Sequence, residues 1–380
     1  MNTKHNVLES NLGRYLKANK EEKGRMLDEW VQLLSMHRKS IIRFMKKKQK
    51  KDSRVQPKKR GRRERYGPAV TVALKEVWEI SSELCAERLH PIVNEYVRIL
   101  KRDSMWNYAK DTTALLLQMS LGTMKNRITK FRSVKRKQRQ NTTKASKLIT
   151  EIPLRTGPWD NPEPGYGEID TVVHCGSTLA GNMAYTVNYT DIRSTWWAAS
   201  AQLNKGESAT VTSIEAIECR LPFPLHGLDP DNGSEFINWH LKGWCDIHTP
   251  PIELTRSRPN KKNDNAHIEQ KNGSIIRQFL GYCRIDTEEQ IKLLNQLYAG
   301  PLYLYINFFQ PSMKCTGKKR IGSKYRRSYD IPKTPYKRIL ELDFLDQPSK
   351  NQLSAHYESL NPLKLKQEID ILISKIFSKK

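Results

Sequence analysis

The stretch Gly167–Cys175, GEIDTVVHC, decides the fold of the central part of the chain. Its β-branched residues predict a buried strand. Asp170 lies in the middle of this run, between Ile169 and Val172. A carboxylate inside a buried strand costs free energy unless it is paired, hydrogen-bonded or bound to a metal. Asp170 is therefore the first candidate for a functional residue.

The elements that follow this stretch predict a mixed α/β sheet. Met183–Asp191 and Thr195–Leu203 are similar runs after short turns, which predicts three strands in an antiparallel meander. Of the neighbours Trp196 and Trp197, we expect one side chain to face inward and the other outward. Helices and short strands then alternate, which is typical of a mixed sheet flanked by helices. The predicted helices are 206–219, 234–246, 265–280 and 288–309, and the predicted strands are 225–228 and 252–255.

Two further carboxylates have a distinctive context. Asp231 follows the predicted strand 225–228 and opens the turn Asp231–Phe236, DNGSEF. It is therefore placed at the carboxyl end of a strand, where open α/β sheets bind ligands. Glu269 lies in the predicted helix 265–280. We take Asp170, Asp231 and Glu269 as one candidate site.

Neighbouring acids leave alternatives open. Asp229 could replace Asp231 if the strand ends elsewhere. Glu168 faces the same way as Asp170 on the strand, so it could be an extra ligand or could form a salt bridge. Asp264 is expected to cap the helix that carries the third acid, where its charge suits the N-terminal dipole.

The three acids resemble those of DDE transposases and retroviral integrases in order, context and spacing. Glu168–Thr171 is similar to the first motif of that family, Asp231–Phe236 to the second, and Lys262–Asn272 to the third. Between the second and third acids lie 37 residues. The resemblance spans roughly residues 160–310. It implies an α/β ribonuclease-H-like catalytic domain.

The resemblance also implies the chemistry. Asp170, Asp231 and Glu269 would be the catalytic residues and the metal ligands, holding two Mg²⁺ ions, with Mn²⁺ as a substitute. Asp170 would bridge both ions. In-line displacement at phosphorus needs this arrangement, because the metals activate the attacking oxygen and stabilise the leaving one. Mg²⁺ prefers carboxylate oxygens as ligands.

The implied activity is that of a DNA transposase of the DDE type, which cleaves DNA and transfers strands. Its partners would be double-stranded DNA, both the terminal inverted repeats and the target, and it would act as a homo-oligomer on DNA. We expect a cytoplasmic, nucleoid-associated protein without membrane contact. The alternatives are a sequence-specific DNA-binding regulator or domesticated element with an inactive core, and a structure-specific nuclease of the same fold.

The charge is distributed unevenly along the chain, with an acidic middle and basic flanking parts. The chain of 380 residues has a formal charge of +26. Residues 165–310 hold 12 Lys and Arg against 16 Asp and Glu, a net of −4. The flanking parts are therefore strongly basic, which favours contact with a polyanion such as DNA.

The N-terminal half predicts two helix-turn-helix units. In residues 20–47, two helices flank the break Ser35-Met36-His37, which is typical of this motif. The second unit ends in a short helix after about residue 122, whose apolar positions recur at helical spacing. Exposed cations and amides on the second helix of each unit would grip phosphates or read bases. These predicted DNA-binding residues are Arg38, Lys39 and Arg43 in the first unit, and Lys125, Asn126, Arg127 and Lys130 in the second.

Further cations surround the third motif inside the acidic middle of the chain. We expect them to bind phosphates beside the metals without reading sequence. They are Arg256, Arg258, Lys261, Lys262 and Lys271.

These patterns divide the chain into all-α tandem helix-turn-helix domains, a catalytic domain and a mainly helical C-terminal tail. A stripe of Leu and Ile in 363–376 could assemble with a second protomer or pack within the chain. The six cysteines are scattered without metal-ligand spacing, so we predict no zinc. The predicted boundaries are 1–48 for the first DNA-binding domain, 49–65 for a basic linker, 66–132 for the second DNA-binding domain, 133–160 for a basic, Pro-rich linker, 161–310 for the catalytic domain and 311–380 for the basic, helical C-terminal region.

Overall fold

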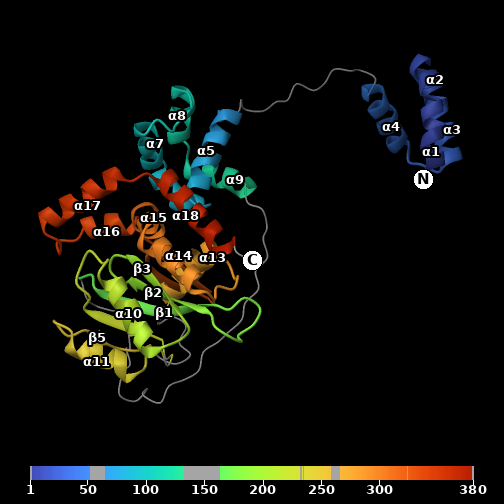
Figure 1. The fold of residues 1–380 in the computed structure, drawn as a ribbon. Helices are drawn as coiled ribbons and strands as arrows, with labels where there is room; N and C mark the ends of the chain where they lie inside the picture. Colours follow the sequence, from blue (N-terminus) through green and yellow to red (C-terminus); the bar gives the residue numbers. More distant parts are fainter. Residues whose placement is uncertain are drawn as a thin grey trace. The chain divides into compact units, whose positions relative to one another are not determined.

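The computed structural model describes two compact units, residues 1–65 and 66–380. Figure 1 shows the chain coloured along its sequence. The described residues are 2–51, 65–131, 163–231, 233, 235–257, 266–322 and 324–378. The predicted linker 133–160 and most of the linker 49–65 lie outside them. Among the described helices, none is long and apolar enough to cross a membrane.

The first unit is a small helical bundle. Asn19 and Glu22 cap its third helix reciprocally, and Ser35 ends that helix in a left-handed conformation. The helices and the three-residue break agree with the prediction, while their use in DNA binding stays a prediction. The helices are α1 Asn2–Ser10, α2 Leu12–Lys17, α3 Lys20–Leu34 and α4 Arg38–Lys51.

The second unit is built around a mixed five-stranded sheet. Its strand order is β3-β2-β1-β4-β5. The first three strands form the predicted antiparallel meander, and β4 and β5 run parallel to β1. This sheet is consistent with a ribonuclease-H-like core. The strands are β1 Tyr166–His174, β2 Ala184–Asp191, β3 Trp197–Leu203, β4 Gly227–Pro230 and β5 Glu253–Leu254.

Helices cover both faces of this sheet. Successive residues of β3 are buried, which requires cover on both faces. Trp196 and Trp197 are accordingly both buried, so the expectation that one faces outward is wrong. The helix predicted over 288–309 is divided at Gly300, where Pro301 starts a second helix. The helices that follow β3 are α10 Glu207–Glu218, α11 Trp239–Ile247, α12 Ala266–Lys271, α13 Arg277–Leu280, α14 Glu288–Ala299 and α15 Pro301–Phe309.

The helices before the sheet share its hydrophobic core. The Tyr305 hydroxyl donates to the Ile80 carbonyl at 2.6 Å, and the Tyr96 hydroxyl donates to the Phe309 carbonyl at 3.1 Å. The region predicted as a second DNA-binding domain is thus part of the same compact unit as the sheet. These helices are α5 Pro68–Ile80, α6 Ala86–Leu89, the 3₁₀ turn η1 His90–Ile92, α7 Val93–Arg102, α8 Lys110–Leu117 and α9 Leu121–Phe131.

The C-terminal region contains a hairpin that we did not predict. Strands β6 Cys315–Ile321 and β7 Lys324–Tyr329 pair with each other, so this region is not wholly helical. Helix α18 packs on α14, α15 and α5. Residues of the Leu and Ile stripe in 363–376 are buried in these contacts, so the stripe packs within the chain. Figure 1 shows α14, α15 and α18 between the sheet and the helices α5, α7 and α8. The C-terminal helices are α16 Pro335–Leu340, α17 Gln347–Ser359 and α18 Pro362–Phe377.

The outer edge of β3 is closed by side chains. Asn307 binds both backbone groups of Trp197, accepting from the N–H and donating to the carbonyl, each at 2.8 Å. Asn295 does the same for Ala201. These amides replace the hydrogen bonds that a neighbouring strand would supply, and they protect the edge from pairing with another chain.

We therefore predict that Asn307→Leu lowers the free energy of unfolding by about 2–4 kcal/mol, because it leaves two buried backbone groups without partners. Urea denaturation of the purified chain measures this change. Asn94→Leu, a substitution at an exposed position of α7, is the matched control and should change stability little. Equal stability of the two variants would contradict the role of Asn307.

Candidate active site

The pairing of β1 with β4 brings Asp170 and Asp231 together. The two strands are parallel, and Ile169 is paired with Pro230. Asp170 and Asp231 are the next residues on each strand. Equivalent residues of neighbouring strands point to the same face of a sheet, so the two carboxylates lie side by side.

The pKa shifts of the two carboxylates agree with this placement. Burial raises the pKa of Asp170 well above its ordinary value, and the charge of Asp231 raises it further. Burial also raises the pKa of Asp231, with a further contribution from Glu235. Each carboxylate is therefore costly to ionise in this site without a cation.

Glu235 is a third carboxylate beside this pair. It is 4% exposed, and its Oε1 accepts a hydrogen bond of 2.7 Å from the Thr171 hydroxyl. Lys205 forms an ion pair of 2.5 Å with its Oε2. We did not single out Glu235 from the sequence, although it belongs to the DNGSEF motif of Asp231.

A chain of two amides, the half-buried Asn272 and the buried Asn188, holds the Asp170 carboxylate. Asn272 donates to Asp170 Oδ2 at 2.6 Å, and Asn188 donates to Asn272 Oδ1 at 2.5 Å. The indole of Trp197 donates to Asn188 Oδ1 at 2.5 Å. Asn272 opens a π-helical turn, Asn272–Ile276, a local irregularity that is frequent at functional sites. The network fixes one oxygen of Asp170.

Glu269 lies on the helix that directly precedes Asn272. It is exposed in the first turn of α12, three residues before Asn272, and residues at this spacing share a helix face. Glu168 holds the start of the same helix, because its carboxylate accepts from the Ile268 N–H at 2.9 Å. Asp229 is fully buried and accepts from Thr255, so it belongs to the sheet interior rather than to the pair.

The donor set suits a hard divalent cation. Among the described residues, no group of three His, Cys, Asp or Glu side chains is close enough to hold a metal ion. Asp170 and Asp231 nevertheless offer adjacent carboxylate oxygens, the ligand type that Mg²⁺ prefers. Burial is the main cause of the raised pKa of both groups, with added repulsion from Asp231 at Asp170 and from Glu235 at Asp231, and a bound cation would favour the ionised forms. The residues that are present therefore fit such an ion.

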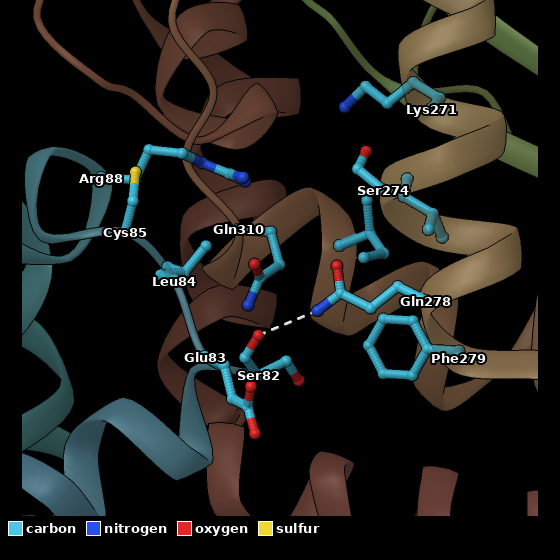
Figure 2. Close-up of a pocket in the computed structure, with 12 residues that line it drawn as sticks. Ser82, Glu83, Leu84, Cys85, Arg88, Lys271, Ser274, Gln278, Phe279 and Gln310 are labelled. Carbon is cyan, nitrogen blue, oxygen red and sulfur yellow. Dashed lines mark hydrogen bonds between the residues drawn. The ribbon is translucent and has the colours of Figure 1, made fainter. Parts of the chain in front are cut away.

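Lys271 lies on a different side of α12 from the site. It lines a cavity of about 220 Å³ that contains neither Asp170 nor Asp231. Figure 2 shows its ammonium pointing toward Arg88 across this cavity. Burial lowers the pKa of Lys271 to about 7, helped by the charge of Arg88. Arg256 is buried, and Arg258, Lys261 and Lys262 lie outside the described residues.

Some, but not all, of the predicted DNA-binding side chains on helices α4 and α9 are exposed. Lys39 and Arg43 are exposed on α4, whereas Arg38 pairs with Asp28. On α9, Arg127 donates to the Tyr66 carbonyl at 2.7 Å and is half-buried. The other expected residues of α9, all exposed, are Lys125, Asn126 and Lys130.

Comparison with known proteins gives one clear relative. No family model matches the sequence. The uncharacterized protein y4rM of Sinorhizobium fredii (strain NBRC 101917 / NGR234) is 35% identical over 340 residues, which cover 89% of this chain and 95% of the relative. The chain belongs to the same family as y4rM.

Two solved structures show a weaker similarity to this member of the y4rM family. They are the HTLV-2 integrase catalytic core domain in complex with magnesium, in a dimeric and a trimeric form. The identities are 16% and 15%, both TM-scores are 0.28, and the matches cover 39% of this chain and 89% and 88% of those chains. The strand order and register described above, rather than this similarity, support the ribonuclease-H-like assignment.

The raised pKa of Asp170 predicts a pH-dependent stability. The folded state holds the proton more tightly than the unfolded chain, so stability falls as pH rises from about 4 through the folded pKa. We expect the free energy of unfolding of Asp170→Asn, measured by urea denaturation in EDTA, to exceed that of the wild type by at least about 1 kcal/mol at pH 8. This difference should vanish near pH 4.

The exposed substitution Asp246→Asn on α11 is the control for this measurement and should follow the wild-type curve. Parallel pH profiles of Asp170→Asn and the wild type would show that the carboxylate pair carries no uncompensated repulsion.

Proposed function

We propose that this chain is a DNA transposase that cuts and joins DNA with the carboxylates Asp170, Asp231 and Glu269. One observation carries the proposal. Two acids from separate parts of the chain follow paired positions of β1 and β4, and burial raises the pKa of both carboxylates. A divalent cation bound between them would relieve the cost of ionising both.

In the proposed chemistry, the metal ions and the protein side chains have different roles. When bound, two divalent cations would activate the attacking oxygen and stabilise the leaving oxygen of an in-line displacement at phosphorus. Asp170 and Asp231 would hold them, and Glu269 would complete the set from the exposed face of α12. Asn272 would keep Asp170 oriented, since a ligand whose second oxygen is hydrogen-bonded cannot rotate freely.

The proposed substrate is double-stranded DNA, both the ends of the element and the target. The exposed cations of α4 and α9 would grip its backbone, and Asn126 would be available to read a base edge. We include a homo-oligomer on DNA in the proposal, because two element ends must be joined to one target.

The first test uses DNA that carries the sequences flanking the chain's own gene, incubated with and without Mn²⁺, with nicks and joined products mapped on sequencing gels. We expect cleavage and joining in Mn²⁺. Asp170→Asn, Asp231→Asn and Glu269→Gln should each lower the rate at least about 100-fold, since loss of second-shell partners alone typically costs 10–100-fold.

Asp246→Asn is again the matched control and should leave the rate unchanged. Normal activity in the three carboxylate variants would overturn the proposal. Cleavage without joining would instead identify a nuclease, and binding without cleavage a DNA-binding regulator.

A second test concerns the positioning of Asp170. Asn272→Leu should weaken Mn²⁺ binding, measured by electron paramagnetic resonance, by about 10–100-fold, because the freed carboxylate loses its fixed orientation. The rate should fall with it and recover in part at high Mn²⁺. Gln270→Leu, an exposed change on the same helix, is the control. Unaltered Mn²⁺ affinity in Asn272→Leu would contradict the positioning role.

A further inference from the structure

The hairpin β6–β7 is a small sheet of its own. Its two strands pair only with each other among the described strands, and every residue of β6 is exposed. An isolated two-stranded hairpin is marginally stable in water. Something outside its own hydrogen bonds must therefore explain why this hairpin is present on the surface.

The hairpin carries a dense positive charge. Residues 314–329 contain seven Lys and Arg and no Asp or Glu. The register places Lys318 opposite Arg327 and Lys319 opposite Arg326. Like charges directly opposite each other destabilise a strand pair. The sequence of the hairpin thus opposes its own stability unless an anion lies against it.

Both faces of the hairpin present these cations. Alternation along the strands puts Lys319 and Arg326 on one face and Lys318 and Arg327 on the other. The Lys318 ammonium lies 4.4 Å from the ring centre of Tyr325, which is 56% exposed. In the part of the chain that the structure describes, no carboxylate forms an ion pair with these four cations.

The base of the hairpin, in contrast, is firmly mounted. The Lys314 N–H donates to Asp330 at 2.6 Å, and Asp330 also pairs with Arg338 at 2.7 Å. The Lys314 ammonium donates to the carbonyl of Ile192 at 2.7 Å in the turn between β2 and β3. The cations therefore project from a fixed support, which lowers the entropic cost of binding a partner.

We propose that the hairpin 315–329 binds duplex DNA as a two-stranded β-ribbon in the major groove. The major groove of B-form DNA admits such a ribbon, and the phosphates on either side of it match cations on both faces. The major groove of an RNA duplex is too deep and narrow for the same insertion. The DNA partner is shared with the proposed function, but this site uses neither the carboxylates nor a metal.

The experiment compares double variants of equal charge in the full chain. Lys319→Gln/Arg326→Gln and Lys318→Gln/Arg327→Gln each remove one opposed pair, and Lys292→Gln/Lys364→Gln removes two exposed lysines elsewhere in the same unit. Binding to a 30-base-pair DNA duplex is measured by fluorescence anisotropy in EDTA at several salt concentrations. RNA duplexes and anionic vesicles of phosphatidylserine serve as competing partners.

Each hairpin variant should bind DNA at least about 5-fold more weakly, and the log-log salt slope should become shallower by about 1–2, since each lost phosphate contact removes about 0.9. The control variant should change affinity less than about 2-fold. Melting temperatures of the hairpin variants should be unchanged or higher, because repulsion between opposed cations is removed.

Affinity and slope equal to those of the control would overturn the inference, as would tighter binding of RNA or vesicles than of DNA. Failure here is distinguishable from failure of the proposed function. Asp170→Asn should lose cleavage while binding DNA at least as tightly as the wild type, and hairpin variants that bind normally would leave the cleavage results standing.

Discussion

The parallel pairing of β1 with β4 is the constraint on which the site depends. It brings the Asp170 and Asp231 positions to the same level of the sheet although 60 residues of chain separate them. Burial raises the pKa of both carboxylates, and the charge of Asp231 adds to the rise at Asp170. Ionising both groups at this position is therefore unfavourable. A bound cation would offset this cost, which makes the pair more informative than either acid alone.

Helix α12 is attached to β1 at both of its ends. Glu168 binds the backbone at the start of the helix, and Asn272, just beyond its end, binds Asp170. Glu269 lies between these two attachments. The attachments limit how far this carboxylate can move from the pair, even though its side chain points into solvent in the present structure. The backbone that carries Glu269 is therefore fixed to β1 on both sides of this residue, while its side chain is exposed.

Sequence patterns predicted the elements whose cause is local. The β-branched run of β1 and the break Ser35-Met36-His37 between α3 and α4 are such causes, because strand propensity and helix breaks are visible in a few residues. The burial of both Trp196 and Trp197 depends on helices from distant parts of the chain. The π-helical turn at Asn272 shifts backbone hydrogen bonds and leaves no side-chain pattern. The hairpin β6–β7 is basic rather than apolar, so it lacked the usual strand signature.

The acidic pair and the basic surfaces act over different distances. Exposed charges are screened beyond a Debye length of about 8 Å at physiological salt. Surface cations, such as those of the hairpin, can attract a phosphate backbone to the protein surface. Because of screening, these cations have little electrostatic effect on the carboxylates unless they lie close to them. Repulsion between those carboxylates and an approaching phosphate must therefore be relieved inside the site. Under the proposed function, affinity for DNA and chemistry on DNA would therefore require separate groups, and this division would account for an acidic centre in a chain with a net charge of +26.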